Sequence, residues 1–433
     1  MIMDKKNILI FPIGSENGLN IFNSIKYNLH FDVFGASGQN DHAEYIVPNE
    51  RLIVNKGFYI NNKETFLREL NGVLDKYNIH YLIPTHDTIC RFLMENYKRI
   101  DATIVCSPYE TSVIAEDKNK QYEALKTKWY FPTVFNKEDA KYPVFLKPFV
   151  AAGGKGAIKV DNIDELEKEF LNRQDLLICE YLPGEECTVD CFTNKDRELL
   201  FVGARSRERI TNGISYLSRR VELTDEIYEI AQDLNSTFKF RGAWFFQIKK
   251  DANGEYKLLE FSVRQAGTMA YYRQLGVNFT LLSLFDFMEY PVKILCNNIE
   301  LRLDRGIETL YSLEYDYDTI YLDYDDTLIL NDKVNTDIIR FVYQSHNKGK
   351  KIILLTKHIG DLKSDLTRYR LAENLFDEIK IIEPNKRKAD YIIEPRCILI
   401  DNFFPERLDV FQKCNIPVFD VDAIECLIDR REF

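Results

Sequence analysis

Two segments of this 433-residue chain carry side chains that could bind phosphate groups or react with them. The first is the strand-like segment from Tyr142 to Pro148, which carries Lys147 near its end. A glycine-rich loop follows, with Gly153, Gly154 and Gly156. Glycines let a backbone approach phosphate oxygens closely, so that its N–H groups can point at them. A plain hairpin turn would also explain a lysine beside such a loop, so the surrounding sequence has to decide.

Three further motifs stand in order around this loop. Glu116-Asp117-Lys118 precedes it, the run CEYLPGEECTVD follows at residues 179–190, and LLEFSVRQAG follows at residues 258–267. With the lysine and its glycine loop, these motifs resemble the ATP-grasp superfamily, particularly its carbamoyl phosphate synthetase and biotin carboxylase branch. The resemblance covers roughly residues 1–310, and four ordered motifs at plausible spacing make it specific.

The resemblance implies a role for each matching residue. Lys118 and Lys147 are expected to hold the α- and β-phosphates of ATP, and the glycine loop to close over them. Glu186 is expected to accept hydrogen bonds from the ribose hydroxyls. The hinge beside the adenine is expected to consist of Glu180, Tyr181 and Leu182.

The metal and phosphoryl positions follow from the same resemblance. Gln247 and Glu260 are expected to coordinate Mg²⁺, with Mn²⁺ as an alternative, because hard oxygen ligands suit these ions. Ser262 stands where the family usually has asparagine, so it is expected to hold the second metal differently or through water. Arg264 is expected to face the transferred phosphoryl group. Apolar neighbours alternate with Gln247 and with Glu260, which predicts that both lie on one side of their strands.

Three arginines alternate along one predicted strand end, namely Arg205, Arg207 and Arg209. One of them could touch phosphate or a substrate carboxylate. The alternation favours the simpler interpretation of a solvated basic strand, and no single arginine is singled out.

The second run is an apolar segment, residues 320–322, that leads into Asp323-Tyr324-Asp325-Asp326-Thr327. Two aspartates two residues apart at a strand end can divide the work of phosphate ester hydrolysis. Asp323 can attack phosphorus as a nucleophile, and Asp325 can move the proton to and from the leaving oxygen. A magnesium ion would bridge nucleophile and phosphate.

Other candidates follow in order: Thr356 as a hydroxyl donor for phosphate, Lys388 as the balancing charge for Asp323, and Asp401 as a metal ligand. Residues 318–433 thus resemble the haloacid dehalogenase (HAD) superfamily of phosphohydrolases. Asp326 replaces the usual small residue, and Asn402 replaces a common second aspartate, with Glu406 as a substitute. An inert scaffold remains an alternative. Two other interpretations of the acidic run fit less well. The run lacks the glycine that an EF-hand calcium loop requires, and the Asp-x-Asp-x-Thr motif favours a hydrolase over a receiver domain.

The element pattern predicts a mixed α/β and α+β chain of three domains. Residues 1–110 alternate strands and helices, which indicates a parallel, Rossmann-like sheet, and the resemblance implies that this is the pre-ATP-grasp domain. Residues 111–312 carry antiparallel strand signals and form the two-lobed ATP-grasp domain of the resemblance. Residues 316–433 return to strand–helix alternation and form a Rossmannoid HAD-like domain.

Composition limits the classes of function. The formal net charge of −11 argues against broad nucleic-acid binding. No apolar run approaches the roughly 18 residues of a membrane helix, and the N-terminal run is better explained as a buried strand than as a signal peptide. Nine cysteines without paired spacing indicate reduced thiols and a cytoplasmic protein.

The prediction is therefore an ADP-forming carboxylate–amine ligase that works through an acyl phosphate. Its substrates are expected to be a small-molecule carboxylate and an amine. The fused Mg²⁺-dependent phosphatase domain is expected to act on a phosphorylated substrate or product, such as a sugar or another metabolite. Two alternatives stay open: a phosphotransferase with a regulatory or inactive HAD-like domain, and a non-catalytic nucleotide-binding module. The oligomeric state is not predicted.

Overall fold

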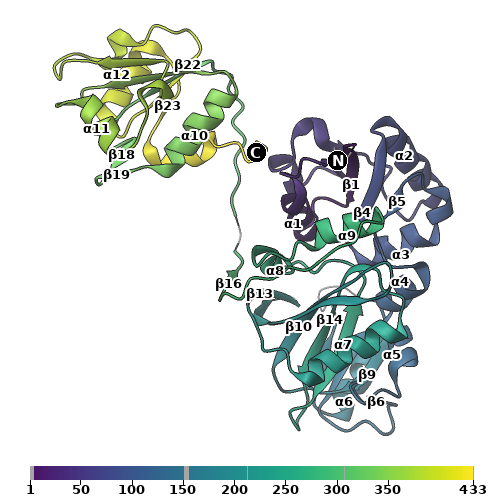
Figure 1. Ribbon diagram of the computed structural model, residues 1–433. Coiled ribbons are helices and arrows are strands. Elements are labelled where there is room, and N and C mark those ends of the chain that lie inside the picture. Colours follow the sequence, from purple (N-terminus) through teal and green to yellow (C-terminus); the bar gives the residue numbers. More distant parts are fainter. Residues whose placement is uncertain (1–3, 151–155, 212, 307, 433) are drawn as a thin grey trace. The chain divides into compact units, whose positions relative to one another are not determined.

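The computed structural model describes residues 4–150, 156–211, 213–306 and 308–432. Its internal contacts divide the chain into two units, Met1–Ile307 and Glu308–Phe433, and each is described by itself (Figure 1). Within the described residues, no helix combines the length and apolar character that a membrane crossing requires.

The first unit begins with a five-stranded parallel sheet in the order β3-β2-β1-β4-β5. Ile8 and Ile10 of the central strand pack with helix α1, whereas Leu9 and Phe11 pack with α2 and α3. The strand is apolar on both faces because helices cover both. The strands are β1 (Lys6–Phe11), β2 (Phe31–Ser37), β3 (Leu52–Val54), β4 (Ile79–Pro84) and β5 (Thr103–Ile104). The helices are α1 (Glu16–Ile25), α2 (Lys63–Lys76), α3 (Asp87–Glu95) and α4 (Tyr109–Glu116).

A four-stranded antiparallel sheet, β6-β9-β7-β8, forms the next layer. Helix α5 (Lys118–Leu125) precedes it and begins where the Asp117 carboxylate accepts hydrogen bonds from the N–H groups of Asn119 and Lys120. Helix α6 (Ile163–Asn172) packs on the sheet through Leu166 and Phe170. The strands are β6 (Val134–Phe135), β7 (Val144–Pro148), β8 (Ile158–Val160) and β9 (Leu176–Glu180).

A second antiparallel sheet has the order β11-β10-β14-β15, and its strands contribute Trp244, Phe246 and Phe261 to a buried core cluster. Along β10, Cys187, Val189 and Cys191 face the same core cluster as helix α7 (Asp225–Thr237). The alternate residues, including Thr188 and Asp190, therefore lie on the opposite face. The strands are β10 (Glu186–Thr193), β11 (Leu199–Ser206), β14 (Gly242–Lys250) and β15 (Tyr256–Ser262).

A small sheet, β12-β13-β16, joins distant parts of the sequence. Strands β12 (Glu208–Thr211) and β13 (Ile214–Arg219) form a hairpin, and β16 (Arg302–Asp304) pairs with β13. The sequence patterns do not predict this sheet. Two more helices, α8 (Ala270–Gln274) and α9 (Phe279–Phe287), follow β15.

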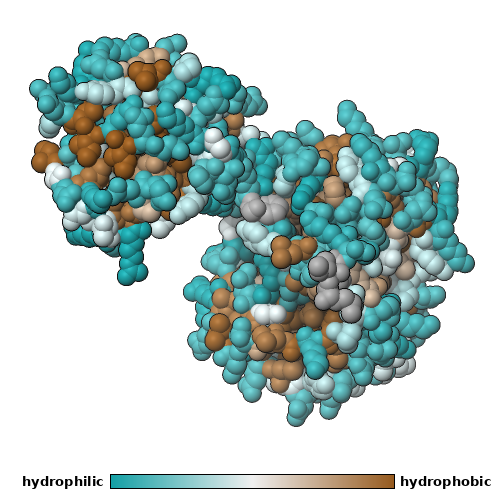
Figure 2. Space-filling view, turned by 45° about the horizontal axis from the view of Figure 1, so that its top comes forward, coloured by the Kyte–Doolittle hydropathy of each residue, from teal (hydrophilic) through white to brown (hydrophobic). Residues whose placement is uncertain are grey.

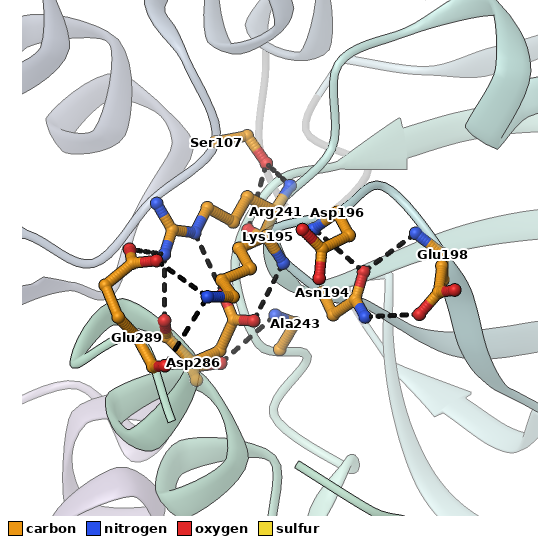
Figure 3. A network of polar contacts seen from close by, with 10 residues as sticks. Ser107, Asn194, Lys195, Asp196, Glu198, Arg241, Ala243, Asp286 and Glu289 are labelled. Atoms are coloured by element: carbon orange, nitrogen blue, oxygen red, sulfur yellow. Dashed lines mark hydrogen bonds and ion pairs between the residues drawn. The ribbon is translucent and has the colours of Figure 1, made fainter. Parts of the chain in front are cut away.

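A polar network fixes α9 to the start of β14 and to the β10–β11 turn (Figure 3). The buried carboxylate of Asp286 accepts hydrogen bonds from Nε of Arg241 at 2.8 Å and from the backbone N–H of Lys195 at 2.7 Å. The Ser107 hydroxyl, which comes from the parallel-sheet part, accepts a hydrogen bond from the Arg241 backbone N–H at 3.1 Å. One buried acid thus ties three segments together.

The second unit holds a five-stranded parallel sheet in the order β21-β20-β17-β22-β23. All four residues of the central strand are buried, as its apolar run predicts. The strands are β17 (Thr319–Leu322), β20 (Lys351–Thr356), β21 (Glu378–Ile381), β22 (Cys397–Ile400) and β23 (Val418–Phe419), with a hairpin of β18 (Ile329–Leu330) and β19 (Lys333–Val334). The helices are α10 (Thr336–Asn347), α11 (Leu362–Arg368) and α12 (Phe404–Cys414).

Candidate functional site

A cleft of about 730 Å³ lies in the first unit. Its lining comes from the turn before α1, the start of α5, strands β7 and β9, and one face of the β11-β10-β14-β15 sheet. In Figure 2 apolar surface gathers on this unit inside a border of hydrophilic side chains. The cleft brings together nine residues that the motifs single out: Lys118, Lys147, Glu180, Tyr181, Leu182, Glu186, Gln247, Glu260 and Arg264.

The remaining candidates of this half are placed differently. Gly153 and Gly154 lie outside the described residues. Gly156 has a φ of +72°, a conformation that favours glycine. Ser262 ends β15, one strand position beyond Glu260 on the same face.

Gln247 and Glu260 are cross-strand neighbours in the β14–β15 pair. Both side chains line the cleft, as their alternation with apolar residues predicts. Their amide and carboxylate oxygens are ligands that Mg²⁺ accepts. The donor set therefore fits a magnesium ion at this position.

The charges around Glu260 keep it ionised. Its Oε2 lies 2.8 Å from Nζ of Lys118. Enclosure in the cleft raises the pKa of Glu260, but the positive charges of Lys118, Lys147 and Arg264 outweigh this and lower it below its ordinary value. Nζ of Lys147 donates to the backbone carbonyl of Leu259 at 3.4 Å. The motif residues therefore form one electrostatically connected group.

Asp87, the first residue of α3, is a member of this group that the sequence motifs do not include. Its carboxylate accepts hydrogen bonds from the Ser262 hydroxyl and, at 2.9 Å, from Nε of Arg264. Burial lowers the pKa of Arg264, but its contacts with Asp87, together with the charge of Glu260 and the nearby Cys90, outweigh burial and raise the pKa. The signal for Asp87 in the sequence is its place three residues after the end of β4, beyond the carboxyl end of a parallel strand, where sites form in open α/β sheets.

The interpretation of the three alternating arginines as a solvated strand is wrong for Arg205 and Arg207 and holds only for Arg209. Arg205 is fully buried, with Nε at 2.7 Å from Oδ2 of Asp190. The Arg207 side chain is 8% exposed and binds the carboxylate of Glu186 through Nε. Only Arg209 is exposed, where it pairs with Asp304. Burial against carboxylates on the neighbouring strand is the physical reason.

The second candidate site lies at the carboxyl ends of β17, β20 and β22 in the second unit. Asp323 follows β17, Thr356 ends β20 and Asp401 follows β22. Lys388, at the start of a short 3₁₀ helix (Lys388–Tyr391), places Nζ 2.6 Å from carboxylate oxygens of both Asp323 and Asp401. The structure thus joins residues that are 78 positions apart in the sequence.

Burial and the neighbouring charges act in opposite directions on the pKa values of this group. Burial raises the pKa of Asp323 to about 6, although the charge of Lys388 opposes the shift. Burial acts to lower the pKa of Lys388, but the carboxylates of Asp323 and Asp401 outweigh it and raise the value. Carboxylate oxygens at two adjacent strand ends fit a magnesium ion chemically. Within the described residues, no three histidine, cysteine, aspartate or glutamate side chains are already gathered as a metal cage.

Asp325 lies at the surface of this site and has a partner that the motif does not include. Its side chain is 53% exposed, and its oxygens lie 3.0 and 3.2 Å from Nδ1 of His358. Asp326 has a φ of +53°, which aspartate tolerates better than most residues. Glu406 binds Lys357, and Asn402 accepts a hydrogen bond from Thr327, so neither replaces the missing aspartate at Lys388.

Comparisons with known proteins agree with the first of these sites. A family model described as ATP-grasp in the biosynthetic pathway with Ter operon matches residues 172–298. A D-alanine–D-alanine ligase from Petrotoga mobilis is 26% identical over 159 residues, which are 31% of this chain and 53% of that protein. The chain therefore spans about half the length of this curated relative.

Solved structures share the fold at low sequence identity. A biotin carboxylase from Campylobacter jejuni in complex with a β,γ-ATP ligand has a TM-score of 0.57 and 14% identity, covering 67% of this chain and 73% of that one. The biotin carboxylase domain of 2-oxoglutarate carboxylase from Hydrogenobacter thermophilus, in complex with MgADP, ADP and bicarbonate, has a TM-score of 0.56 and 15% identity, covering 69% and 73%.

The fold and the cleft thus define a mixed α/β multidomain protein, similar in fold to the solved biotin carboxylase structures. The family model and the curated relative add sequence similarity to this likeness in fold. They support the ATP-grasp superfamily, which is the one that the motifs predict. Enzymes of that superfamily use ATP and Mg²⁺. At the level of the family, they support ligase-type chemistry.

Proposed function

We propose that the first unit is an ATP-dependent ligase that joins a carboxylate to an amine through an acyl phosphate. The observation that supports this most is the convergence of Lys118, Lys147, Glu186, Gln247, Glu260 and Arg264 on one cleft. These residues are spread over 147 positions of sequence, and a phosphoryl-transfer site needs their types together.

Each of these residues has a specific role in such a reaction. ATP supplies the phosphoryl group that activates the carboxylate, and Mg²⁺ held by Gln247 and Glu260 would neutralise phosphate charge. Lys118 and Lys147 place positive charge at the same end of the cleft. Arg264, oriented by Asp87, presents its guanidinium toward the transferred group. Electrostatic groups fixed before the reaction stabilise the charge that develops in its transition state.

A screen for ADP release tests the ligase. Carboxylates are crossed with amines in the presence of Mg·ATP, and each acid and each amine is also supplied alone. The proposal expects ADP and an amide product only when a matching pair is present. ADP with a phosphorylated product and no amide would instead identify a phosphotransferase. Failure to bind Mg·ATP in calorimetry would leave a non-catalytic module.

For the second unit we propose a magnesium-dependent, HAD-like phosphatase that acts on a phosphorylated substrate or product of the ligase. The contacts from Lys388 to both Asp323 and Asp401 support it, because this arrangement puts a nucleophile, its counter-charge and a metal-binding oxygen at one sheet edge. Asp323 would attack phosphorus, and Thr356 would donate a hydrogen bond to the phosphate.

Hydrolysis of p-nitrophenyl phosphate with and without Mg²⁺ tests this second activity. Wild-type protein is expected to release nitrophenol, and Asp323→Asn to release none. The same variant tests the link between the two reactions. If the phosphatase trims a ligase product, Asp323→Asn still consumes ATP and accumulates a phosphorylated amide. Products identical to those of wild type would reject the link.

A further inference from the structure

Arg205 carries an unused hydrogen-bond donor at the floor of the cleft. The residue is fully buried. Its Nε and Nη2 donate to the two carboxylate oxygens of Asp190 at 2.7 and 3.1 Å. Within the part of the chain that the structure describes, its Nη1 has no hydrogen-bond partner. A buried guanidinium N–H is rarely left unmatched, because its desolvation is costly.

The sheet register shows where this donor lies relative to the nucleotide residues. Thr188 pairs with Arg205 on one side and with Gln247 on the other, and Gln247 pairs with Glu260. All four side chains line the cleft, so they form one row across it. With about 4.8 Å between strands, the backbone of Arg205 lies roughly 10 Å from that of Gln247 and roughly 14 Å from that of Glu260. Arg205 therefore stands at the opposite end of the row from the proposed metal ligands.

Apolar side chains stand beside this end of the row. Ile210 and Ile214, from the β12–β13 hairpin, line the cleft while 42% and 41% exposed. The hairpin continues directly from the strand that carries Arg205. Exposed isoleucines inside a cleft indicate a surface that a ligand covers.

We propose that Arg205 and the β12–β13 hairpin form the site for the substrate that is not the nucleotide, and that this substrate is an oxyanion with an apolar body. Nη1 of Arg205 donates to the anionic group, a carboxylate or a phosphoryl group, since guanidinium N–H groups match either. Ile210 and Ile214 cover the apolar body. The inference rests on the proposed ligase function and adds the class of its second substrate.

The test uses the full-length protein saturated with Mg²⁺ and a non-hydrolysable ATP analogue, so that the γ-phosphate position is filled. Three probes of equal chain length are titrated by calorimetry: valerate, n-butylphosphonate and n-butylammonium. Replacing Arg205 alone would strand the buried charge of Asp190 and could unfold the protein. The test variant is therefore Asp190→Asn with Arg205→Met, which removes both charges. Arg209→Met is the matched control, because Arg209 is exposed on the same hairpin.

One or both oxyanions should bind to wild type, and which one binds identifies the anionic group. The ammonium probe should not bind. The double variant should bind the oxyanion at least ten-fold more weakly, with the analogue's affinity changed less than two-fold. Ile210→Ser should weaken valerate more than acetate.

Equal oxyanion binding by the double variant, or none by wild type, overturns the inference. If wild type fails to bind the ATP analogue, the ligase proposal fails instead. The same probes on nucleotide-free protein then still show whether Arg205 binds an anion.

Discussion

Glu260 has two proposed roles, and one conservative substitution can test them without changing the shape of the side chain. Its carboxylate pairs with Lys118 and is the proposed ligand for Mg²⁺. Glu260→Gln keeps the shape of the side chain but removes its charge, so ADP release should fall by at least about ten-fold, the usual scale for disturbing a metal site. Added Mg²⁺ should recover part of the loss. The measurement is ADP release against metal concentration.

Glu255→Gln is the matched control for that experiment. Glu255 lies in the β14–β15 turn, where its carboxylate pairs with Lys257 and is 61% exposed. An exposed pair contributes about 0–1 kcal/mol to stability, and Glu255 does not line the cleft. Equal losses in both variants would contradict a specific role for Glu260.

The buried environment of Asp323 should change how the stability of the folded protein depends on pH. Burial raises the pKa of Asp323 from 3.8 to about 6, so the folded state holds the proton more tightly than the unfolded chain. As pH rises from about 4 to 6, the unfolded state loses this proton first, and the folded state is destabilised relative to it. Asp323→Asn removes this effect. In metal-free buffer, its unfolding midpoint should equal or exceed that of wild type at pH 7.5.

The advantage of Asp323→Asn should shrink below pH 6 and vanish as the pH falls below the unfolded-state pKa of 3.8, where wild type becomes protonated in both states. Thermal unfolding with EDTA at several pH values measures it. A variant that is clearly less stable than wild type at pH 7.5 would mean that the contact with Lys388 outweighs the burial of the charge.

At the scale of elements, the buried acid Asp286 should matter far more than its exposed neighbour. Asp286 is 1% exposed and binds the Arg241 side chain and the backbone N–H of Lys195. Glu289 is 63% exposed and binds the side chains of Arg241 and Lys195 (Figure 3). Removing Asp286 takes away the acceptor of the Lys195 backbone N–H and of Arg241, and leaving such donors unmatched costs about 1–3 kcal/mol. Asp286→Ala should therefore lower the unfolding free energy of the first unit by about that much, measured in urea.

Glu289→Ala, at the rim of the same network, should cost no more than about 1 kcal/mol. Similar costs for the two variants would indicate that the network acts through its exposed charges. The comparison isolates burial, because both acids share Arg241 as a partner.

Most strands of the two parallel sheets could be predicted because their signals are local, whereas the three-residue edge strand β3 (Leu52–Val54) could not. An apolar run such as Ile8–Phe11 or Thr319–Leu322 identifies itself without knowledge of its neighbours. The β12-β13-β16 sheet could not be predicted. Its third strand has only three residues, Arg302–Asp304, and pairs with a hairpin more than 80 positions earlier. Such a pairing depends on tertiary contacts that leave no periodic pattern.

The site residues likewise fall into those that the sequence predicts and those that it does not. Lys147 and Glu260 stand in motifs whose order in the sequence is informative, and the cleft brings them together. Arg205 was misinterpreted because alternation tells which residues share a face but not what covers that face. Its partner Asp190 lies on the adjacent strand, 15 residues earlier. Asp87 begins helix α3, whereas Ser262 and Arg264 lie at and just after the end of β15, at least 175 positions later, so no local pattern connects it to them.

At the scale of the molecule, each unit has its own core. Among the described residues, the buried clusters around Leu9, Ile8, Phe192 and Val144 contain only residues of the first unit. The clusters around Ile320 and Tyr321 contain only residues of the second. Neither proposed site borrows a residue across the division, since the cleft lies wholly before residue 307 and the aspartate group wholly after it.

Separate expression of residues 1–307 and 308–433 tests whether each unit is a folding domain. Each fragment should unfold cooperatively, since each contains its own buried apolar clusters. Calorimetry should show two transitions for the full chain, each within a few degrees of one fragment. The first fragment should bind the ATP analogue with wild-type affinity. The second should retain phosphatase activity, because Arg430–Glu308 and Arg396–Asp316 pairs hold its entry segment internally.

A first fragment that binds the nucleotide ten-fold more weakly, or a second that is unfolded, would show that one unit depends on the other. That result would also change the interpretation of the fusion. Two independent domains need only share a pathway, so their substrates would pass through solution. Interdependent domains would instead require that ligation and phosphate removal be coordinated on the same molecule, and Asp323→Asn would then slow ADP release as well as abolish hydrolysis.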